Sequence, residues 1–285
     1  MKTIILNSSN YVPGSGNQFS IAFPGNGVKF NAGDRIAVAG LAIYNSVFNI
    51  TAARGNNKFT VIWNALSPQT YTFTFPDGYY SANDMNAFIQ QQCILNNLYM
   101  TTNNGSTYVY FVEIATNAVR YAISLNVYAL PTSARATTLG YSLPTGATWT
   151  LPTSAQTPQI TIGTAFGQLV GQAAGTYPAA ISATSVQTIS AFTPIISPVD
   201  SFIFCCNLIN SRLTNPTDLL YSVPITVPLG QLINISPSQF LFNDIDANTY
   251  SNITISMYDQ LFNKLQLNDK DVVIQLAIQF ASERA

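Results

Sequence analysis

Charged side chains are scarce in this sequence. Only 8% of its 285 residues are Asp, Glu, Lys or Arg, whereas about a quarter of the residues in ordinary globular domains are charged. Polar character comes instead from Asn, Gln, Ser and Thr, which form hydrogen bonds without the desolvation cost of an ion. Charge keeps crowded soluble molecules apart, so this composition favours a protein that packs against neighbours. A secreted β-protein with a Thr- and Asn-rich surface would have a similar composition.

Histidine is absent from the chain. Its absence removes the commonest general base, the usual zinc ligand and every Ser-His or Cys-His nucleophile pair. The acidic segment at 244–248 starts like a calcium loop, but Thr249 stands where the sharp turn needs Gly and Ile255 where the bidentate Glu belongs. No Gly-rich phosphate loop follows a strand and opens a helix. We therefore expect no enzymatic activity, no metal and no cofactor.

Clustered basic residues and long apolar runs are also missing. Binding phosphates needs several neighbouring Lys or Arg side chains, and none are clustered here, so we expect no direct contact with nucleic acid. The apolar runs 36–44 and 272–280 are strand-length and fall short of the roughly 20 residues that a spanning helix needs. The apolar run at 4–6 ends too early for a secretion signal. We expect no membrane span.

The cysteines do not form a disulfide pattern. There are 3, an odd number, and Cys205 and Cys206 are adjacent within an apolar run. Buried free cysteines behave as small apolar residues, and disulfides persist mainly in oxidising compartments. We therefore interpret the three side chains as buried thiols in a reducing compartment.

One segment contains a strand pattern and a helix pattern, joined by a defined turn. Tyr71, Phe73 and Phe75 alternate with threonines, which predicts a strand with one buried face. A Pro-Asp-Gly turn follows at 76–78. Ser81 then stands at the N-cap position of a helix, with a carboxylate three residues later. The spacing predicts a helix over 82–96 that packs through four side chains: Met85, Phe88, Ile89 and Cys93.

Short strands separated by Gly, Asn, Pro or Asp clusters dominate the rest of the chain. Many short strands with turn-rich connections and one convincing helix predict an all-β sandwich or barrel. Strands at 252–258 and 272–280 are expected to form a closing hairpin, which implies non-local, Greek-key pairing elsewhere. The remaining expected strands are 18–23, 34–44, 58–63, 69–75, 108–114, 120–128, 201–208, 218–223 and 239–243.

A change in composition divides the chain. The stretch 136–199 contains no charged residue, yet it holds enough aromatic and aliphatic side chains to indicate a folded insertion rather than a tether. We predict that 18–135 and 200–285 together form one sandwich, and that 136–199 is an inserted β and loop lobe. We predict that 1–17 is an N-terminal arm with contacts outside its own subunit, because it has little means of folding alone.

Three segments carry a family resemblance. They are DGYYS leading into the helix at 77–81, NSRLTNPTDLLYSVPI at 210–225, and ISMYDQLFNKLQLNDKDVVIQLAI at 255–278. In this order they resemble the penton, or minor capsid, proteins of virophages and related Polinton-type viruses. The likeness covers about half of the chain and none of 136–199. It implies a single jelly-roll sandwich of Greek-key type, with one helix and an outward insertion, standing perpendicular to a capsid surface.

The resemblance also implies a function and partners. The chain would be a structural capsid protein of the virion, assembled inside the host cell, with five copies as a homopentamer at each icosahedral vertex. Its other partner would be the double jelly-roll major capsid protein. The chain is too short to be that major protein itself, because a double jelly roll needs two eight-stranded sandwiches in addition to the insertion.

A binding module is the alternative. A jelly-roll domain that recognises a carbohydrate or a receptor could use aromatic side chains of the insertion as stacking platforms: Tyr141, Trp149 and Tyr177. The same residues would also suit the core of a small insertion. The native mass separates the two hypotheses. A five-fold assembly supports the capsid protein, whereas a monomer or trimer with measurable glycan binding supports the module.

Overall fold

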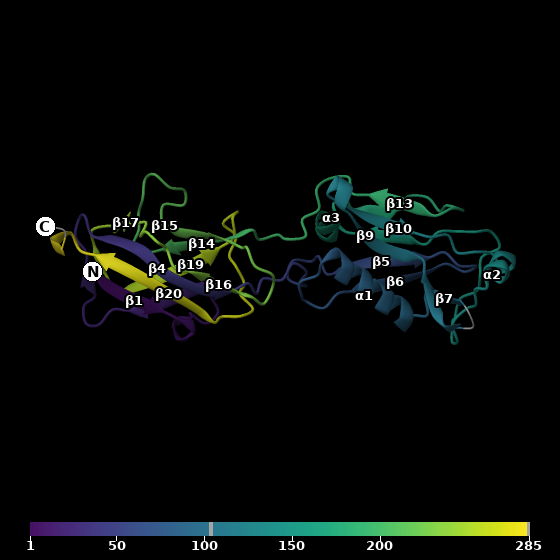
Figure 1. Ribbon diagram of the computed structural model, residues 1–285, viewed down its shortest axis with the longest axis horizontal. Helices are drawn as coiled ribbons and strands as arrows, with labels where there is room; N and C mark the ends of the chain where they lie inside the picture. The colour runs from purple at the N-terminus through teal and green to yellow at the C-terminus, as the bar shows by residue number, and fades with distance from the viewer. Residues whose placement is uncertain (103–104, 284–285) are drawn as a thin grey trace. The chain divides into compact units, whose positions relative to one another are not determined.

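The structure is a computed structural model that describes residues 1–102 and 105–283 (Figure 1). It divides into two compact units. Unit 1 comprises Met1–Val47 and Val199–Ala285, and unit 2 comprises Phe48–Pro198. Each unit buries its own cluster of apolar side chains. The second unit is therefore an insertion into the sequence of the first.

Unit 1 consists mainly of two antiparallel sheets. The first contains β1 (Lys2–Leu6), β20 (Val272–Gln279), β4 (Arg35–Tyr44) and β16 (Leu232–Ile235) in that order, with the short β17 (Asn243–Asp244) also paired with β4. The second contains β15 (Leu219–Pro224), β14 (Ser201–Cys206), β19 (Asn252–Tyr258) and β2 (Gln18–Ala22) in that order. A small ladder joins β3 (Val28–Lys29) to β18 (Thr249–Tyr250).

The chain follows a jelly-roll path between these sheets. In chain order β1, β4, β16 and β20 lie in the first sheet, while β2, β14, β15 and β19 lie in the second. Strands far apart in sequence therefore pair, as β1 does with β20 and β2 with β19. Eight strands in two Greek keys are the definition of a jelly roll. The predicted fold class is confirmed.

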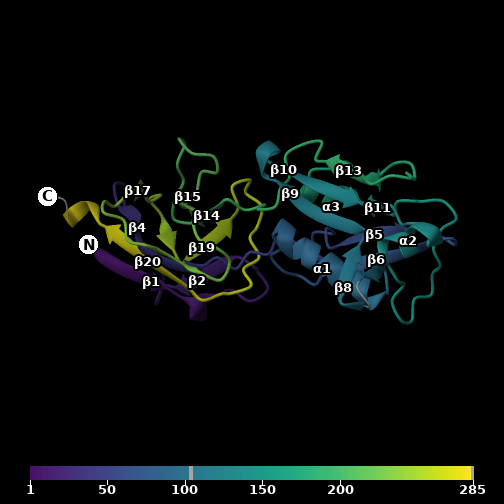
Figure 2. The same ribbon diagram turned by 45° about the vertical axis from the view of Figure 1, so that its right-hand side comes forward.

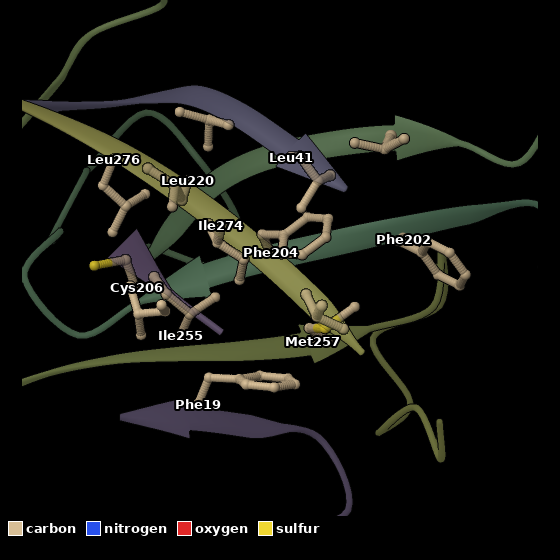
Figure 3. Close-up of a cluster of buried hydrophobic side chains, with 14 of the residues drawn as sticks. Phe19, Leu41, Phe202, Phe204, Cys206, Leu220, Ile255, Met257, Ile274 and Leu276 are labelled. Carbon is tan, nitrogen blue, oxygen red and sulfur yellow. The ribbon is translucent and has the colours of Figure 1, made fainter. Parts of the chain in front are cut away.

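The core of unit 1 lies between its two sheets. Ile253, Ile255 and Met257 of β19 are buried, and the residues between them are not. This period-two pattern gives each strand one inward face. Figure 3 shows Leu41 and Ile274 from the first sheet among Phe204 and Met257 from the second. Each large apolar side chain removed from water contributes about 1.5–3 kcal/mol.

The expected closing hairpin is wrong. β19 pairs with β14 and β2 in one sheet, whereas β20 pairs with β1 and β4 in the other. The connection at 259–271 passes between the sheets. Both strands alternate correctly, but alternation specifies only which face is buried and not which strand is the neighbour.

The N-terminal segment is not a free arm. Residues 2–6 form β1, which pairs along its whole length with β20, and Leu6 is fully buried. Asn17 donates a hydrogen bond from Nδ2 to the carbonyl oxygen of Met257 at 2.7 Å. The short apolar run at the start of the chain is stabilised by an edge that only the distant C-terminal strand supplies. Segment 1–17 is therefore part of the jelly roll.

Unit 2 contains two larger sheets and one isolated pair of strands. One sheet has the order β12 (Gly175–Tyr177), β11 (Gln159–Ile162), β5 (Lys58–Trp63), β6 (Gln69–Thr74), and the other β13 (Val186–Ile189), β10 (Ala122–Val127), β9 (Val112–Asn117). The pair is β7 (Tyr99–Thr102) with β8 (Thr107–Tyr110). The helices are α1 (Ala82–Leu95), α2 (Ser133–Leu139) and α3 (Thr164–Val170), labelled in Figures 1 and 2.

The predicted upstream boundary at 135/136 is wrong, whereas the predicted downstream boundary at 199/200 lies one residue from the junction between Pro198 and Val199. The upstream boundary lies at 47/48, because β5 pairs with β11 and β10 pairs with β13. The segment that carries β5 to β10 thus belongs with the insertion and not with the jelly roll. The change in composition near residue 136 falls inside unit 2. The sequence predicted α1 alone, whereas unit 2 also contains the helices α2 and α3.

Helix α1 confirms its prediction in detail. The Ser81 hydroxyl accepts from the amide of Asp84 at 3.2 Å, and the Asp84 carboxylate accepts from the amide of Ser81 at 2.9 Å. This reciprocal capping box satisfies two amides that the helix leaves free. Met85, Ile89 and Cys93 are buried in the core of unit 2. Phe88 is half-buried and stacks on Phe75 with ring centroids 4.2 Å apart.

Candidate interaction surfaces

Within 1–102 and 105–283, no group of three or more His, Cys, Asp or Glu side chains is placed to hold a metal ion. No helix in these ranges is long and apolar enough to cross a membrane. Burial raises the pKa of each of the three thiols to about 12. These cysteines are protonated at neutral pH and are poor nucleophiles.

Unit 2 has an almost uncharged surface. In its 48–198 range the charged residues are Arg54, Lys58, Asp77, Asp84, Glu113, Arg120 and Arg135. Ion pairs of unit 1 include Arg35 with Asp244 at 2.9 Å and the Met1 amino group with Glu283 at 2.6 Å. All four groups are substantially exposed, and exposed pairs of this kind add little to stability. Contacts with other molecules must therefore rely mainly on apolar and uncharged hydrogen-bonding groups.

The turn after β19 presents two apolar side chains to solvent. Leu261 is 72% exposed and Phe262 is 43% exposed. Beneath them the Asp259 carboxylate, itself buried, accepts hydrogen bonds from the amides of Leu261 at 2.8 Å and Asn263 at 2.9 Å. Its second oxygen accepts from the Asn263 side chain at 2.9 Å. A buried carboxylate thus holds an outward apolar turn in one conformation.

The same turn is strained at Phe262. Its φ is 60°, in the left-handed region that bulky residues rarely adopt. Strain of this kind costs on the order of 1–3 kcal/mol and persists only where the surroundings impose it. The three hydrogen bonds to Asp259 are such surroundings. We call Leu261 and Phe262 the apolar turn, and it is our first candidate contact surface.

Other apolar side chains are exposed at loop tips. In unit 1, Leu213 is 97% exposed between β14 and β15, and Leu241 lies exposed before β17. In unit 2, Val119 is 97% exposed at the turn between β9 and β10, beside the exposed Tyr121. Single exposed apolar residues are common on proteins. Their position at loop tips makes them available to a partner.

A row of threonines crosses the larger sheet of unit 2. Thr72, Thr60, Thr161 and Thr176 are successive cross-strand partners on β6, β5, β11 and β12. The hydroxyls of Thr161 and Thr176 lie 2.9 Å apart, and none of the four residues is buried. The opposite face of this sheet, which includes Phe59, packs into the core. The threonine row is an uncharged, hydrogen-bonding face.

Three tyrosines share one face of the β7–β8 pair. Tyr99 lies opposite Tyr110, and Tyr108 is two residues from Tyr110 on the same strand. The ring of Tyr108 is centred 4.8 Å from that of Tyr99 and 6.4 Å from that of Tyr110. Burial, with smaller contributions from the neighbouring Cys93 and tyrosines, raises the pKa of Tyr110. The sequence analysis did not predict this cluster, although the alternation Tyr108-Val109-Tyr110 is a signal for it.

The three aromatic residues proposed as stacking platforms lie in different settings. Trp149 is 3% exposed, its ring packs edge-on against Trp63 and its Nε1 donates to the Asn97 carbonyl at 2.7 Å. Trp149 is therefore a core residue, and its ring is not exposed for stacking on a ligand. Tyr141 and Tyr177 are half-buried against the core of unit 2. A ligand contact of these two tyrosines stays a prediction.

Comparison with known proteins gives structural neighbours only. No protein-family model and no curated protein matches the chain. A crystal structure of the selenomethionine-labelled mavirus penton protein matches with a TM-score of 0.41 and 10% identity, over 98% of this chain and 100% of that one. The chain is similar to a viral penton protein. A chain of the Sputnik virophage, solved by cryo-EM, matches with a TM-score of 0.40 and 13% identity, over 100% and 99%.

Proposed function

We propose that this chain is a structural capsid protein that forms the pentameric vertex of an icosahedral virus shell. The observation that carries the proposal is the topology of unit 1, which is a complete eight-stranded jelly roll. Viral capsid domains are a major class of jelly roll. The three sequence segments that resemble penton proteins support the same function. Two of them, at 210–225 and 255–278, lie within the jelly roll itself.

The scarcity of charge supports assembly into a ring. Five sandwiches packed side by side around an axis use two different faces of each subunit. An unpaired charge buried in each copy would cost several kcal/mol. The apolar turn, Leu261 and Phe262, has the composition that such a contact needs. We propose it as one of the contacts between subunits, and the double jelly-roll major capsid protein as the partner around the ring.

The proposed role is non-enzymatic and belongs to the virion, with assembly inside the host cell. The absence of histidine from the sequence supports this role, because the commonest acid–base catalyst is unavailable. Assembly should depend only weakly on salt, since few ion pairs are available to be screened.

Mass and position in particles test the proposal. We expect native mass spectrometry of the purified full chain to show a pentamer whose stability changes little between low and high salt. Co-expression with the major capsid protein should give particles in which this chain occupies the five-fold positions by cryo-EM. A stable monomer that never enters those particles would overturn the function.

A further inference from the structure

We propose that the tyrosine face of the β7–β8 pair binds a neutral carbohydrate. This face is defined by Tyr99, Tyr108 and Tyr110 with the hydroxyl side chains of Thr101 and Ser142. It lies within unit 2. The proposal goes beyond the vertex role and does not depend on it, because a sugar site can be present whether or not the chain forms a ring.

The register of the strands gathers these side chains on one face. Tyr99 lies opposite Tyr110, and Thr101 lies opposite Tyr108. Residues two apart on a strand point to the same side, so the rings and the Thr101 hydroxyl share a face. A bridge pairs Thr101 with Ser142, which adds a second hydroxyl to it. Ser142 is exposed.

The opposite face holds the pair in place. Met100 is fully buried in the core of unit 2, and Val109 opposite it packs against that core. Thr101 also exchanges backbone hydrogen bonds with Ser142 at 2.8 and 2.9 Å. The same bridge directs the neighbouring Tyr141 to the core side, away from the three rings. The rings are therefore displayed on a fixed support.

Tyr108 is the most accessible ring of the three, since Tyr99 and Tyr110 are half-buried and Tyr110 also packs against the core of unit 2. Tyr108 is 48% exposed. Among the residues that the structure describes, the hydroxyls of Tyr99, Tyr108 and Tyr110 form no hydrogen bond within the protein. Tyrosine combines a large apolar ring with a hydroxyl that seeks a partner, which makes it suited to ligands with both characters. A pyranose ring offers an apolar C–H face and hydroxyl groups around its edge.

Charge selects the class of ligand. Neither segment 94–110 nor segment 139–150 contains Asp, Glu, Lys or Arg. Nucleic acid bases also stack on aromatic side chains, but their binding sites include a positively charged groove. Sialylated or sulfated glycans carry negative charge, and neither segment supplies a cationic side chain to pair with it. An uncharged face of aromatic rings and hydroxyls therefore fits a neutral oligosaccharide best.

The test uses the full chain and a panel of neutral hexasaccharides: maltohexaose, cellohexaose, mannohexaose and chitohexaose. A sulfated oligosaccharide and oligo-dT are the anionic comparison ligands. Saturation-transfer NMR identifies binders, and titration gives the dissociation constant Kd. For the tightest binder, Tyr108→Ala should raise Kd about three- to tenfold, the range for losing an aromatic contact. Tyr108→Phe keeps the ring and should raise Kd less than Tyr108→Ala does. The matched control is Tyr79→Ala, an exposed tyrosine of unit 2 outside the face, which should leave Kd unchanged.

Three results would overturn the proposal. One is that no hexasaccharide binds the wild-type chain at millimolar concentration. Another is that Tyr108→Ala and Tyr79→Ala weaken binding equally, with melting temperatures matching the wild type. The third is that only a sulfated oligosaccharide or oligo-dT binds, since the ligand would then be an anion. A monomeric native mass would count against the vertex role and would leave this site intact.

Discussion

At the scale of single residues, burial decides the chemistry of the three cysteines and of Trp149. Cys93, Cys205 and Cys206 are at most 1% exposed. Removing a thiolate from water is costly, so the protonated form is favoured in the folded protein. Trp149 shows the same principle for an aromatic ring, because its single polar atom is bonded to a backbone carbonyl and the rest is enclosed. The sequence analysis predicted the burial of the thiols, which the structure confirms, but not the burial of Trp149.

Alkaline pH should destabilise the protein through these thiols. Their pKa is raised from the ordinary 9.0 to about 12. The unfolded chain loses these protons first, so their stabilising contribution is complete below pH 9 and is lost as the pH rises toward 12. Urea unfolding at pH 8, 9, 10 and 11 measures this decline. A Cys93→Ala variant should decline less steeply over the same range, and an equal slope would contradict the assignment.

Thiol labelling provides a second check of the same burial. Iodoacetamide should modify none of the three cysteines in the folded protein at pH 8 and all three in urea, because only exposed thiolates react. Mass spectrometry counts the added groups. Rapid labelling of Cys205 or Cys206 without denaturant would show that the core of unit 1 opens readily.

At the scale of elements, the sequence predicted an element correctly where its stabilising contacts lie between residues close in the chain. Ser81 and Asp84 form the capping box that their spacing indicates, and Met85, Ile89 and Cys93 face the core. Phe88 lies at the margin of the packed face and is only half-buried. By contrast, alternation along 252–258 and 272–280 identified two strands but paired them wrongly. The backbone hydrogen bonds of a helix form within the helix, whereas those of a strand form with a partner strand that its own sequence does not specify.

The cap of α1 gives a prediction with a matched control. Ser81→Ala should lower the free energy of unfolding by about 1 kcal/mol, because the amide of Asp84 loses its acceptor. Phe88→Ala should cost about 2 kcal/mol, less than for a fully buried phenylalanine. Asn83→Ala, at an exposed position of the same first turn, should leave stability within about 0.5 kcal/mol. Urea unfolding of the three variants ranks them, and a larger loss for Asn83→Ala than for Ser81→Ala would refute the capping box.

A substitution in the apolar turn after β19 should weaken assembly without a large change in stability. In Phe262→Gly, relief of the left-handed strain offsets the loss of a half-exposed ring, so the free energy of unfolding should change by less than about 1 kcal/mol. Self-association should nevertheless weaken by at least about tenfold, because aromatic anchors dominate protein interfaces. Val119→Ser, a still more exposed apolar residue in unit 2, is the control. Sedimentation measures association, and equal assembly of both variants would remove this turn from the interface.

At the scale of the whole molecule, the insertion has its own sheets and its own core. The buried apolar side chains between Phe48 and Pro198 form one cluster that includes Trp63, Phe73 and Phe166. A segment with a complete core can fold alone. Its chain ends are also held together, since the Asn49 side chain donates to the carbonyl oxygens of both Tyr80 and Ile196.

Expression of the two units separately tests this independence. Residues 48–198 alone should unfold cooperatively, and so should a chain in which a short Gly-Ser linker joins Val47 to Val199. Circular dichroism and urea unfolding measure both. The Asn49→Ala variant of the insertion should lose about 2 kcal/mol or more, because the carbonyl oxygens of Tyr80 and Ile196 lose their donor and the amide of Tyr80 loses its acceptor. A molten isolated insertion would show that its fold depends on unit 1.

The sequence by itself determined the all-β class, the single strong helix with its cap, and the lack of charge that points to a packed assembly. These properties depend on composition and on contacts between residues close in the chain. Only the tertiary structure decided where the insertion begins, that Lys2–Leu6 forms an edge strand, that Trp149 is buried and that three tyrosines share a face. The first two of these depend on pairing between strands that are distant in sequence, such as β1 with β20 and β5 with β11. Period-two alternation is the same for every possible partner, so the choice is made by the packing of the whole unit.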